Sequence, residues 1–195
     1  MTDVHFDVQG ECLPKDHGYL LFKALTALLP WLEEEDLSGI FHVQGAGTEH
    51  GLLLLNHRTK LALRVPKTRV ADLTALTGQS ISVGGYVLTI GKSKLRPLTL
   101  HTPLYAHCVT TGSQDELGFT GDIMRLLDDM DINTRFICGR KQTINTGEGK
   151  AVGFSLMLHG IAIEHAIRVQ EMGLGGNRKL GCGIFIPHKS IQAVA

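Results

Sequence analysis

The order of predicted strands and helices in the first half of the chain is repeated in the second half, and this repeat limits the possible folds most strongly. Period-two patterns predict strands, and 3–4 spacing of apolar residues predicts helices. The first half contains a strand at 4–10, a helix from its N-cap Asp16 to Pro30, strands at 39–44, 51–55 and 60–65, a short helix at 68–76, and a strand pair at 80–91 with a Gly-Gly turn.

The second half follows the same order. It contains a strand at 104–111, a capped helix at 113–130, a strand pair at 134–144 and 150–160, a helix at 161–173 with Gly173 in the C′ position, and a closing strand at 181–187. Apart from two further strands in the first half, each half reads β-α-β-β-α-β, which is the ferredoxin-like (RRM-like) order. The sequence predicts an α+β fold with two such domains, 1–96 and 97–195, joined by a basic, proline-bearing connector near 92–103.

Charge is distributed unevenly along a chain whose formal net charge is zero. The stretches 1–57 and 114–133 are acidic, with net charges of −7 and −5, whereas 58–113 and 134–195 are basic, with +7 and +5. Separated blocks of this kind can place one positive face on a neutral protein, which would attract a polyanion such as RNA. Salt bridges between the blocks explain the pattern equally well.

The sequence gives little support for a membrane protein, a metal-binding protein or a redox protein. No apolar run reaches the roughly 18 residues of a membrane span, and the N-terminus lacks a signal-peptide pattern. The four cysteines are far apart and form no C-x-x-C pair, which disfavours a structural zinc site and fits reduced thiols. We therefore expect a cytoplasmic protein without a membrane partner.

A glycine-rich stretch, "GLGGNRKLGCG" at 173–183, follows the last predicted helix. It matches neither the dinucleotide fingerprint nor the P-loop, because it leads from helix to strand and lacks the required third glycine and Lys-Ser/Thr pair. Exposed glycine backbone beside Arg178 and Lys179 favours phosphate binding. The alternative is a helix C-cap followed by a tight turn, which explains Gly173 and one further glycine.

The terminal "QEMGLGGNRKLGCGIFIP" and the N-terminal "LPKDHGYLLFKAL", within a tandem ferredoxin-like chain, resemble the CRISPR-associated repeat-processing endoribonucleases (CRISPR-associated protein six) of the RAMP superfamily, the Myxan subtype in particular. The resemblance covers essentially the whole chain. It implies cleavage of CRISPR repeat RNA in the precursor transcript to release mature guide RNAs, without metal or cofactor. Other subunits of a CRISPR effector complex are further implied partners.

The resemblance also implies a catalytic histidine near the first helix, a position that His17 matches best. An imidazole suits proton transfer near neutral pH, and a helix N-terminus disfavours its charged form, as a general base requires. Tyr19 is a candidate to position the phosphate or the base. His42, on a neighbouring predicted strand, is the competing histidine.

The implied reaction uses the RNA 2′-hydroxyl as nucleophile and leaves 2′,3′-cyclic phosphate and 5′-hydroxyl ends. The candidate RNA-binding residues lie in the glycine-rich stretch and on the strand pair of the second half: Gly173, Gly175, Gly176, Asn177, Arg178, Lys179, Gly181, Gly183, Arg135, Arg140 and Lys141. Two alternatives remain, a non-catalytic repeat-RNA-binding subunit of an effector complex and a small-molecule enzyme with a phosphate site.

Overall fold

The computed structural model describes residues 1–188 and divides the chain into two compact units. The first unit holds residues 1–97, and the second begins at residue 98. Two short stretches from the second half of the sequence, 145–149 and 179–181, belong to the first unit. Residues 189–195 of the second predicted domain lie outside the described residues.

The first unit is built around a five-stranded antiparallel sheet, with strand order β3-β6-β1-β8-β7, and a small sheet, β2-β5-β4. Its elements are β1 (Thr2–Gln9), β2 (Cys12–Pro14), α1 (Gly18–Thr26), the 3₁₀ helix η1 (Pro30–Glu33), β3 (Gly39–Ile40), β4 (Gly47–Glu49), β5 (Leu52–Leu54), β6 (Lys60–Val65), η2 (Lys67–Arg69), η3 (Ala71–Leu76), β7 (Ser80–Val83) and β8 (Tyr86–Arg96). Without the edge strand β7, the large sheet has the ferredoxin-like order of second, third, first and fourth strand.

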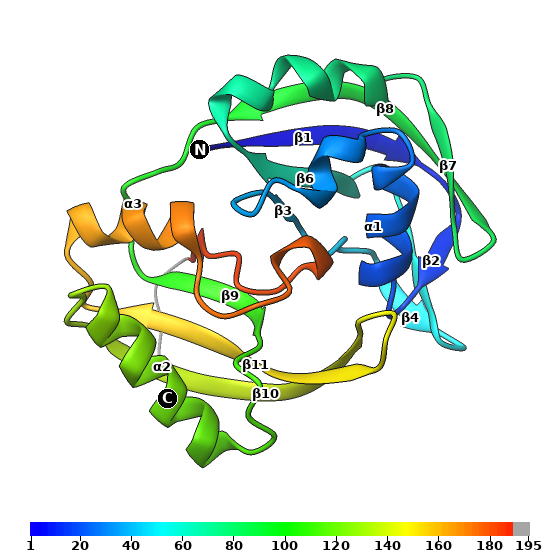
Figure 1. The fold of residues 1–195 in the computed structure, drawn as a ribbon. Coiled ribbons are helices and arrows are strands. Elements are labelled where there is room, and N and C mark those ends of the chain that lie inside the picture. The colour runs from blue at the N-terminus through cyan, green and yellow to red at the C-terminus, as the bar shows by residue number, and fades with distance from the viewer. Residues whose placement is uncertain (189–195) are drawn as a thin grey trace. The chain divides into compact units, whose positions relative to one another are not determined.

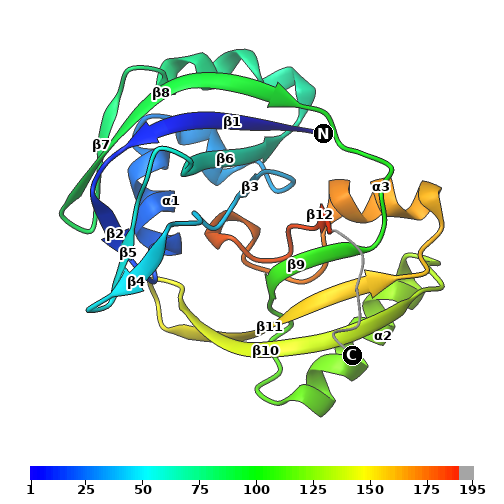
Figure 2. The same cartoon turned by 180° about the vertical axis from the view of Figure 1, so that it is seen from behind.

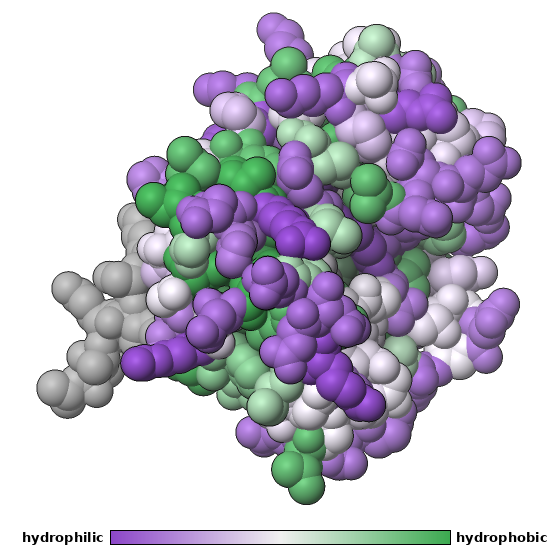
Figure 3. Space-filling view, turned by 60° about the vertical axis from the view of Figure 1, so that its left-hand side comes forward, coloured by the Kyte–Doolittle hydropathy of each residue, from purple (hydrophilic) through white to green (hydrophobic). Residues whose placement is uncertain are grey.

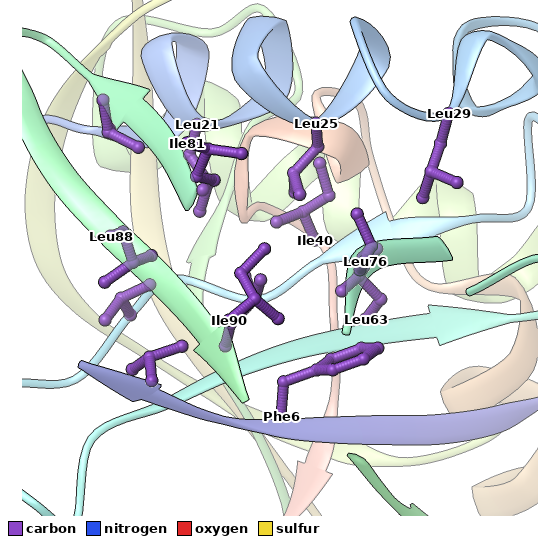
Figure 4. Packing of buried hydrophobic residues seen from close by; sticks show 14 of the residues in the cluster. Phe6, Leu21, Leu25, Leu29, Ile40, Leu63, Leu76, Ile81, Leu88 and Ile90 are labelled. Carbon is purple, nitrogen blue, oxygen red and sulfur yellow. The ribbon is translucent and has the colours of Figure 1, made fainter. Parts of the chain in front are cut away.

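The core of the first unit fills the space between α1 and the large sheet. Alternate residues of β1, such as Val4 and Phe6, face this core and are buried. Figure 4 shows Leu21 and Leu25 pointing from α1 toward Ile90 and the other apolar side chains of the sheet. Burial of this apolar layer fixes α1, and with it the turn at the start of the helix, against the sheet.

The second unit is a four-stranded antiparallel sheet with α2 and α3 on one face, and its strand order, β10-β11-β9-β12, is again ferredoxin-like (Figures 1 and 2). Its elements are β9 (Leu104–Val109), α2 (Glu116–Asp129), β10 (Arg135–Asn145), β11 (Lys150–His159), α3 (Ile163–Met172) and β12 (Ile186–Pro187), and the 3₁₀ helix η4 (Arg178–Leu180) precedes β12. The prediction of a tandem ferredoxin-like α+β fold is confirmed.

Several predicted boundaries were wrong. The first helix ends at Thr26, because the ring of Pro30 would clash with the carbonyl four residues earlier, and Pro30 starts η1 instead. Asp16 is not the N-cap; His17 holds that position without a side-chain cap. The predicted connector is strand as far as Arg96, since β8 continues to pair with β1. The closing strand covers only Ile186–Pro187.

The surface of the protein carries both hydrophilic and hydrophobic side chains. Figure 3 shows one side of the molecule, where hydrophilic residues cover much of the surface and hydrophobic residues form patches between them. Among the exposed hydrophobic residues are Leu117 and Met124 of α2. No helix in the described part of the chain has the length and apolar character needed to cross a membrane.

Candidate active site

His17 lies in the turn between β2 and α1, and its side chain is completely buried, with 0% of the residue exposed. Its Nδ1 is 3.0 Å from the carbonyl oxygen of Pro14, and its Nε2 is 3.1 Å from the backbone nitrogen of Val43. A carbonyl can only accept and an amide N–H can only donate, so the ring proton must be on Nδ1 and Nε2 must accept. Both ring nitrogens are therefore used within the protein.

Burial is the main reason why the pKa of His17 lies below its ordinary value, and the carbonyl of Pro14 and the charge of Asp16 oppose this only in part. The sequence predicts a lowered pKa for His17 from its place at the helix N-terminus, whereas in the structure burial is the main cause. Protonation of Nε2 would also break the hydrogen bond from Val43. The neutral ring is thus held in one tautomer and one orientation.

His42 follows β3 and stacks on His17, with ring centroids 4.4 Å apart and an angle of 24° between the rings. Unlike His17, it is only half-buried. Gly181 lies against its backbone: a Cβ at Gly181 would be 3.2 Å from the His42 nitrogen and 3.3 Å from the His42 Cβ. The structure therefore brings His17, His42 and the end of the glycine-rich stretch together within the first unit.

Tyr19, the second residue of α1, packs against the turn that joins β10 to β11. A Cβ at Gly147 would lie 2.2 Å from two ring carbons of Tyr19, and Gly147 has a φ of 89°. Beside this contact, the carboxylate of Asp16 accepts a 2.9 Å hydrogen bond from the backbone nitrogen of Asn145. Asp16 and Tyr19 thus hold the 145–149 turn next to the start of α1, within the first unit.

The glycines of the 173–183 stretch that lie in the second unit allow backbone to pack on backbone. Gly173, Gly175 and Gly183 have φ values of 72°, 73° and 65°, which favour glycine. A Cβ on Gly173 would lie 2.4 Å from the carbonyl oxygen of Gly183, and one on Gly175 would lie 2.2 Å from that of Thr110. Close packing therefore explains more glycines than the C-cap and tight turn that stood as the alternative to phosphate binding.

Thr110, which sequence reasoning did not select, organises the middle of the stretch. Its hydroxyl donates to the carbonyl of Gly176 at 3.0 Å and accepts from the side-chain amide of Asn177 at 3.0 Å, and its carbonyl accepts from the Gly176 nitrogen at 2.8 Å. Gly175 and Gly176 are nevertheless exposed. A threonine at the end of a predicted strand gives no signal of such contacts in the sequence.

The two adjacent cations of the stretch donate to different backbone carbonyls. The Arg178 guanidinium, half-buried in the second unit, donates to the carbonyl of Gln170 at 3.3 Å. The Lys179 ammonium, in the first unit, donates to the carbonyl of Glu33. Both side chains therefore have contacts that hold the chain, and binding of RNA phosphates by either one stays a prediction.

The candidate cations of the second unit lie on β10, an edge strand of its sheet. Arg135 and Arg140 are exposed. The charge of Arg140 also acts on a histidine of the same unit: burial of His107 lowers its pKa most, and the positive charge of Arg140 lowers it further. Lys141 is exposed as well, and its ammonium donates to the carbonyl of Gln114 at 2.7 Å, which holds the side chain in place and leaves its charge unchanged. All three cations are thus at the surface of the second unit.

Comparisons with known proteins agree with this architecture. A family model described as Cas6 Crispr matches residues 2–190. The chain is 38% identical over 187 residues to the CRISPR-associated endonuclease Cas6 of Myxococcus xanthus, covering 95% of this chain and 81% of that protein.

Solved structures share the fold at low sequence identity. A CRISPR-associated protein Cas6 matches with a TM-score of 0.69 and 13% identity over 96% of this chain and 99% of its own. The product of a Cas6-related gene from Pyrococcus furiosus matches with a TM-score of 0.67 and 13% identity, covering 98% and 99%. Cse3 of Thermus thermophilus, bound to an RNA representing a pre-cleavage complex, matches with a TM-score of 0.53 and 11% identity, covering 94% and 97%.

Proposed function

The chain belongs to the Cas6 family, and we propose that it is an endoribonuclease that cuts CRISPR repeat RNA in the precursor transcript and releases guide RNAs. The 38% identical relative is named as an endonuclease. The observation that carries the proposal is the pair of stacked rings, one buried and fixed and the other half-exposed, beside the glycine-rich stretch. This arrangement fits a site where an imidazole moves a proton.

The proposed chemistry uses the hydroxyl that RNA already carries. The 2′-hydroxyl upstream of the scissile phosphate loses its proton to a base and attacks the phosphorus in line. The 5′-oxygen leaves and takes up a proton, which gives a 2′,3′-cyclic phosphate and a 5′-hydroxyl. Because the nucleophile comes from the substrate, the protein has to orient the strand, transfer protons and balance charge, and no metal-activated water is needed.

We assign the proton transfer to His42 and a positioning role to His17. A general base must come within hydrogen-bond reach of the proton that it removes. His17 does not meet this condition, because it is fully buried and both of its nitrogens are bonded to backbone. His42 is only half-buried, and its stacking on the fixed ring of His17 limits the orientations that it can adopt.

Several of the other predicted site residues keep the role of holding RNA. Gly175 and Gly176 are exposed, so an RNA backbone can approach them closely, and Arg135 and Arg140 offer exposed guanidinium groups for phosphates. Tyr19, whose ring rests on Gly147, would position the strand near α1. Other subunits of an effector complex would receive the product.

A single 2′-deoxy sugar tests the mechanism directly. The purified protein is incubated with its own repeat RNA, and with the same RNA lacking only the 2′-hydroxyl upstream of the cut, each with and without EDTA. We expect the all-RNA strand to be cut in EDTA, with a cyclic phosphate found by mass spectrometry. The deoxy strand should bind about as well, since phosphate contacts dominate affinity, and should remain whole.

Three other results would contradict the proposal. Cleavage of the deoxy strand at the same position would mean that water attacks. Tight binding of the all-RNA strand without cleavage would identify a non-catalytic RNA-binding subunit. Preference for a free nucleotide over the repeat RNA would identify a small-molecule enzyme.

A further inference from the structure

Three consecutive residues, 179–181, lie along the start of α1 and the end of β3, and Figures 1 and 2 show this segment beside α1. A Cβ on Gly18, the first residue of α1, would lie 2.5 Å from the carbonyl oxygen of Leu180. Gly181 lies against the backbone of His42. The 179–181 segment therefore contacts the residue after His17 and the backbone of His42.

The Lys179 ammonium holds the segment from its other side. Its acceptor is the carbonyl of Glu33, the last residue of η1. Carbonyls at the end of a helix lack partners within the helix and carry partial negative charge, so a lysine there is favourably placed. The Glu33 carboxylate is 3.7 Å from the ammonium of a different lysine, Lys23. Lys179 thus binds a backbone carbonyl, which would still be present after substitution of the Glu33 side chain.

The contacts around the segment leave little freedom for a shift. At Gly18 and at Gly181 there is no room for even one additional carbon without movement of a neighbour. Release of Lys179 would let the segment move away from η1 and would free the backbone of His42 on that side. A misplacement of about 1 Å in a catalytic group can reduce a rate by about 100-fold.

We infer that Lys179 is a positioning residue, which fixes the 179–181 segment against His42, and is not a ligand for RNA phosphate. The role in catalysis rests on the proposed function. Arg178 and Lys179, adjacent in sequence, thus bind different backbone carbonyls, those of Gln170 and Glu33.

The test compares Lys179→Met, which keeps the apolar stem but loses the charge, with Lys179→Arg, which keeps a donor. Lys23→Met, an exposed lysine of α1, is the matched control, and Arg140→Met is the reference for a cation proposed to meet phosphate. For each variant we would measure the affinity for repeat RNA at several salt concentrations and the single-turnover cleavage rate at saturating RNA.

We expect Lys179→Met to lower the saturating rate by about 10- to 100-fold while the salt dependence of binding stays that of the wild type. Lys179→Arg should recover most of the rate, and Lys23→Met should match the wild type. A salt slope reduced by about 0.7–0.9, the loss of one phosphate contact, with an unchanged saturating rate would overturn the inference.

A second readout separates this inference from the proposed function. Ring ¹H–¹³C NMR signals of His42 should move in folded Lys179→Met and remain unchanged in Lys23→Met, and this requires no cleavage. If the wild type fails to cut RNA, the proposed function fails, but the His42 signals and the salt slope still decide the position of Lys179. Unchanged His42 signals in Lys179→Met would overturn the positioning role.

Discussion

The turn before α1 and the segment after β3 each contribute one histidine to the same stack, yet the two regions differ in what surrounds the ring. His17 is sealed in the interior, with Pro14 and Val43 bonded to its two nitrogens. His42 is only half-buried. Two histidines that sequence reasoning treats as competitors for one role therefore lie in different surroundings, and only His17 is sealed from solvent.

The two rings also differ in how much they contribute to folding. A buried ring with two hydrogen bonds to backbone contributes to folding, since its loss leaves a cavity and an unpaired amide. A half-buried ring contributes less to folding. We therefore expect substitution of His17 to affect mainly stability and substitution of His42 to affect mainly the cleavage rate. The following measurements can contradict or refine this expectation.

The largest expected effect on stability is that of His17→Ala. It removes the buried ring, leaves the Val43 amide without its acceptor, and should lower the free energy of unfolding by about 3 kcal/mol. Urea unfolding followed by circular dichroism measures the loss. The matched variant His42→Ala should lose about 1 kcal/mol or less. Equal losses in the two variants would mean that burial does not distinguish the two rings.

A smaller effect is expected in the pH dependence of stability. The pKa of His17 is lowered by folding, so the unfolded chain binds its proton more readily, and the stability that neutral His17 supplies is lost as the pH falls below about 6.5. Unfolding curves of the wild type and His17→Gln between pH 7.5 and 5.5 should converge toward low pH. His5 and His107, whose pKa values burial also lowers, affect both proteins alike. Parallel curves would contradict a fixed neutral His17.

Much of the fold could be predicted because local patterns agree with tertiary contacts. The β10–β11 pair and the end of α3 at Gly173 follow directly from period, turn residues and a C-cap. The continuation of β8 to Arg96 could not be read from the basic residues there, because it depends on pairing with β1, far away in the sequence.

The candidate site was predictable in part. The family resemblance, together with histidine chemistry and glycine content, selected His17, His42 and the 173–183 stretch, and the structure brings the two histidines and Gly181 together. Sequence could not show that the Val43 amide and the Pro14 carbonyl occupy both nitrogens of His17, because these are backbone groups that every residue carries. Nor could it show that Lys179 reaches the carbonyl of Glu33.

The central claim is that His42 transfers the proton and His17 positions it, and single-turnover cleavage of repeat RNA by His42→Gln and His17→Gln tests it most directly. Both variants are measured at saturating RNA and at a temperature where each is folded. We predict that His42→Gln loses about 100- to 10,000-fold in rate with RNA affinity unchanged, while folded His17→Gln loses less than about 10-fold. An inactive, folded His17→Gln beside an active His42→Gln would contradict the account.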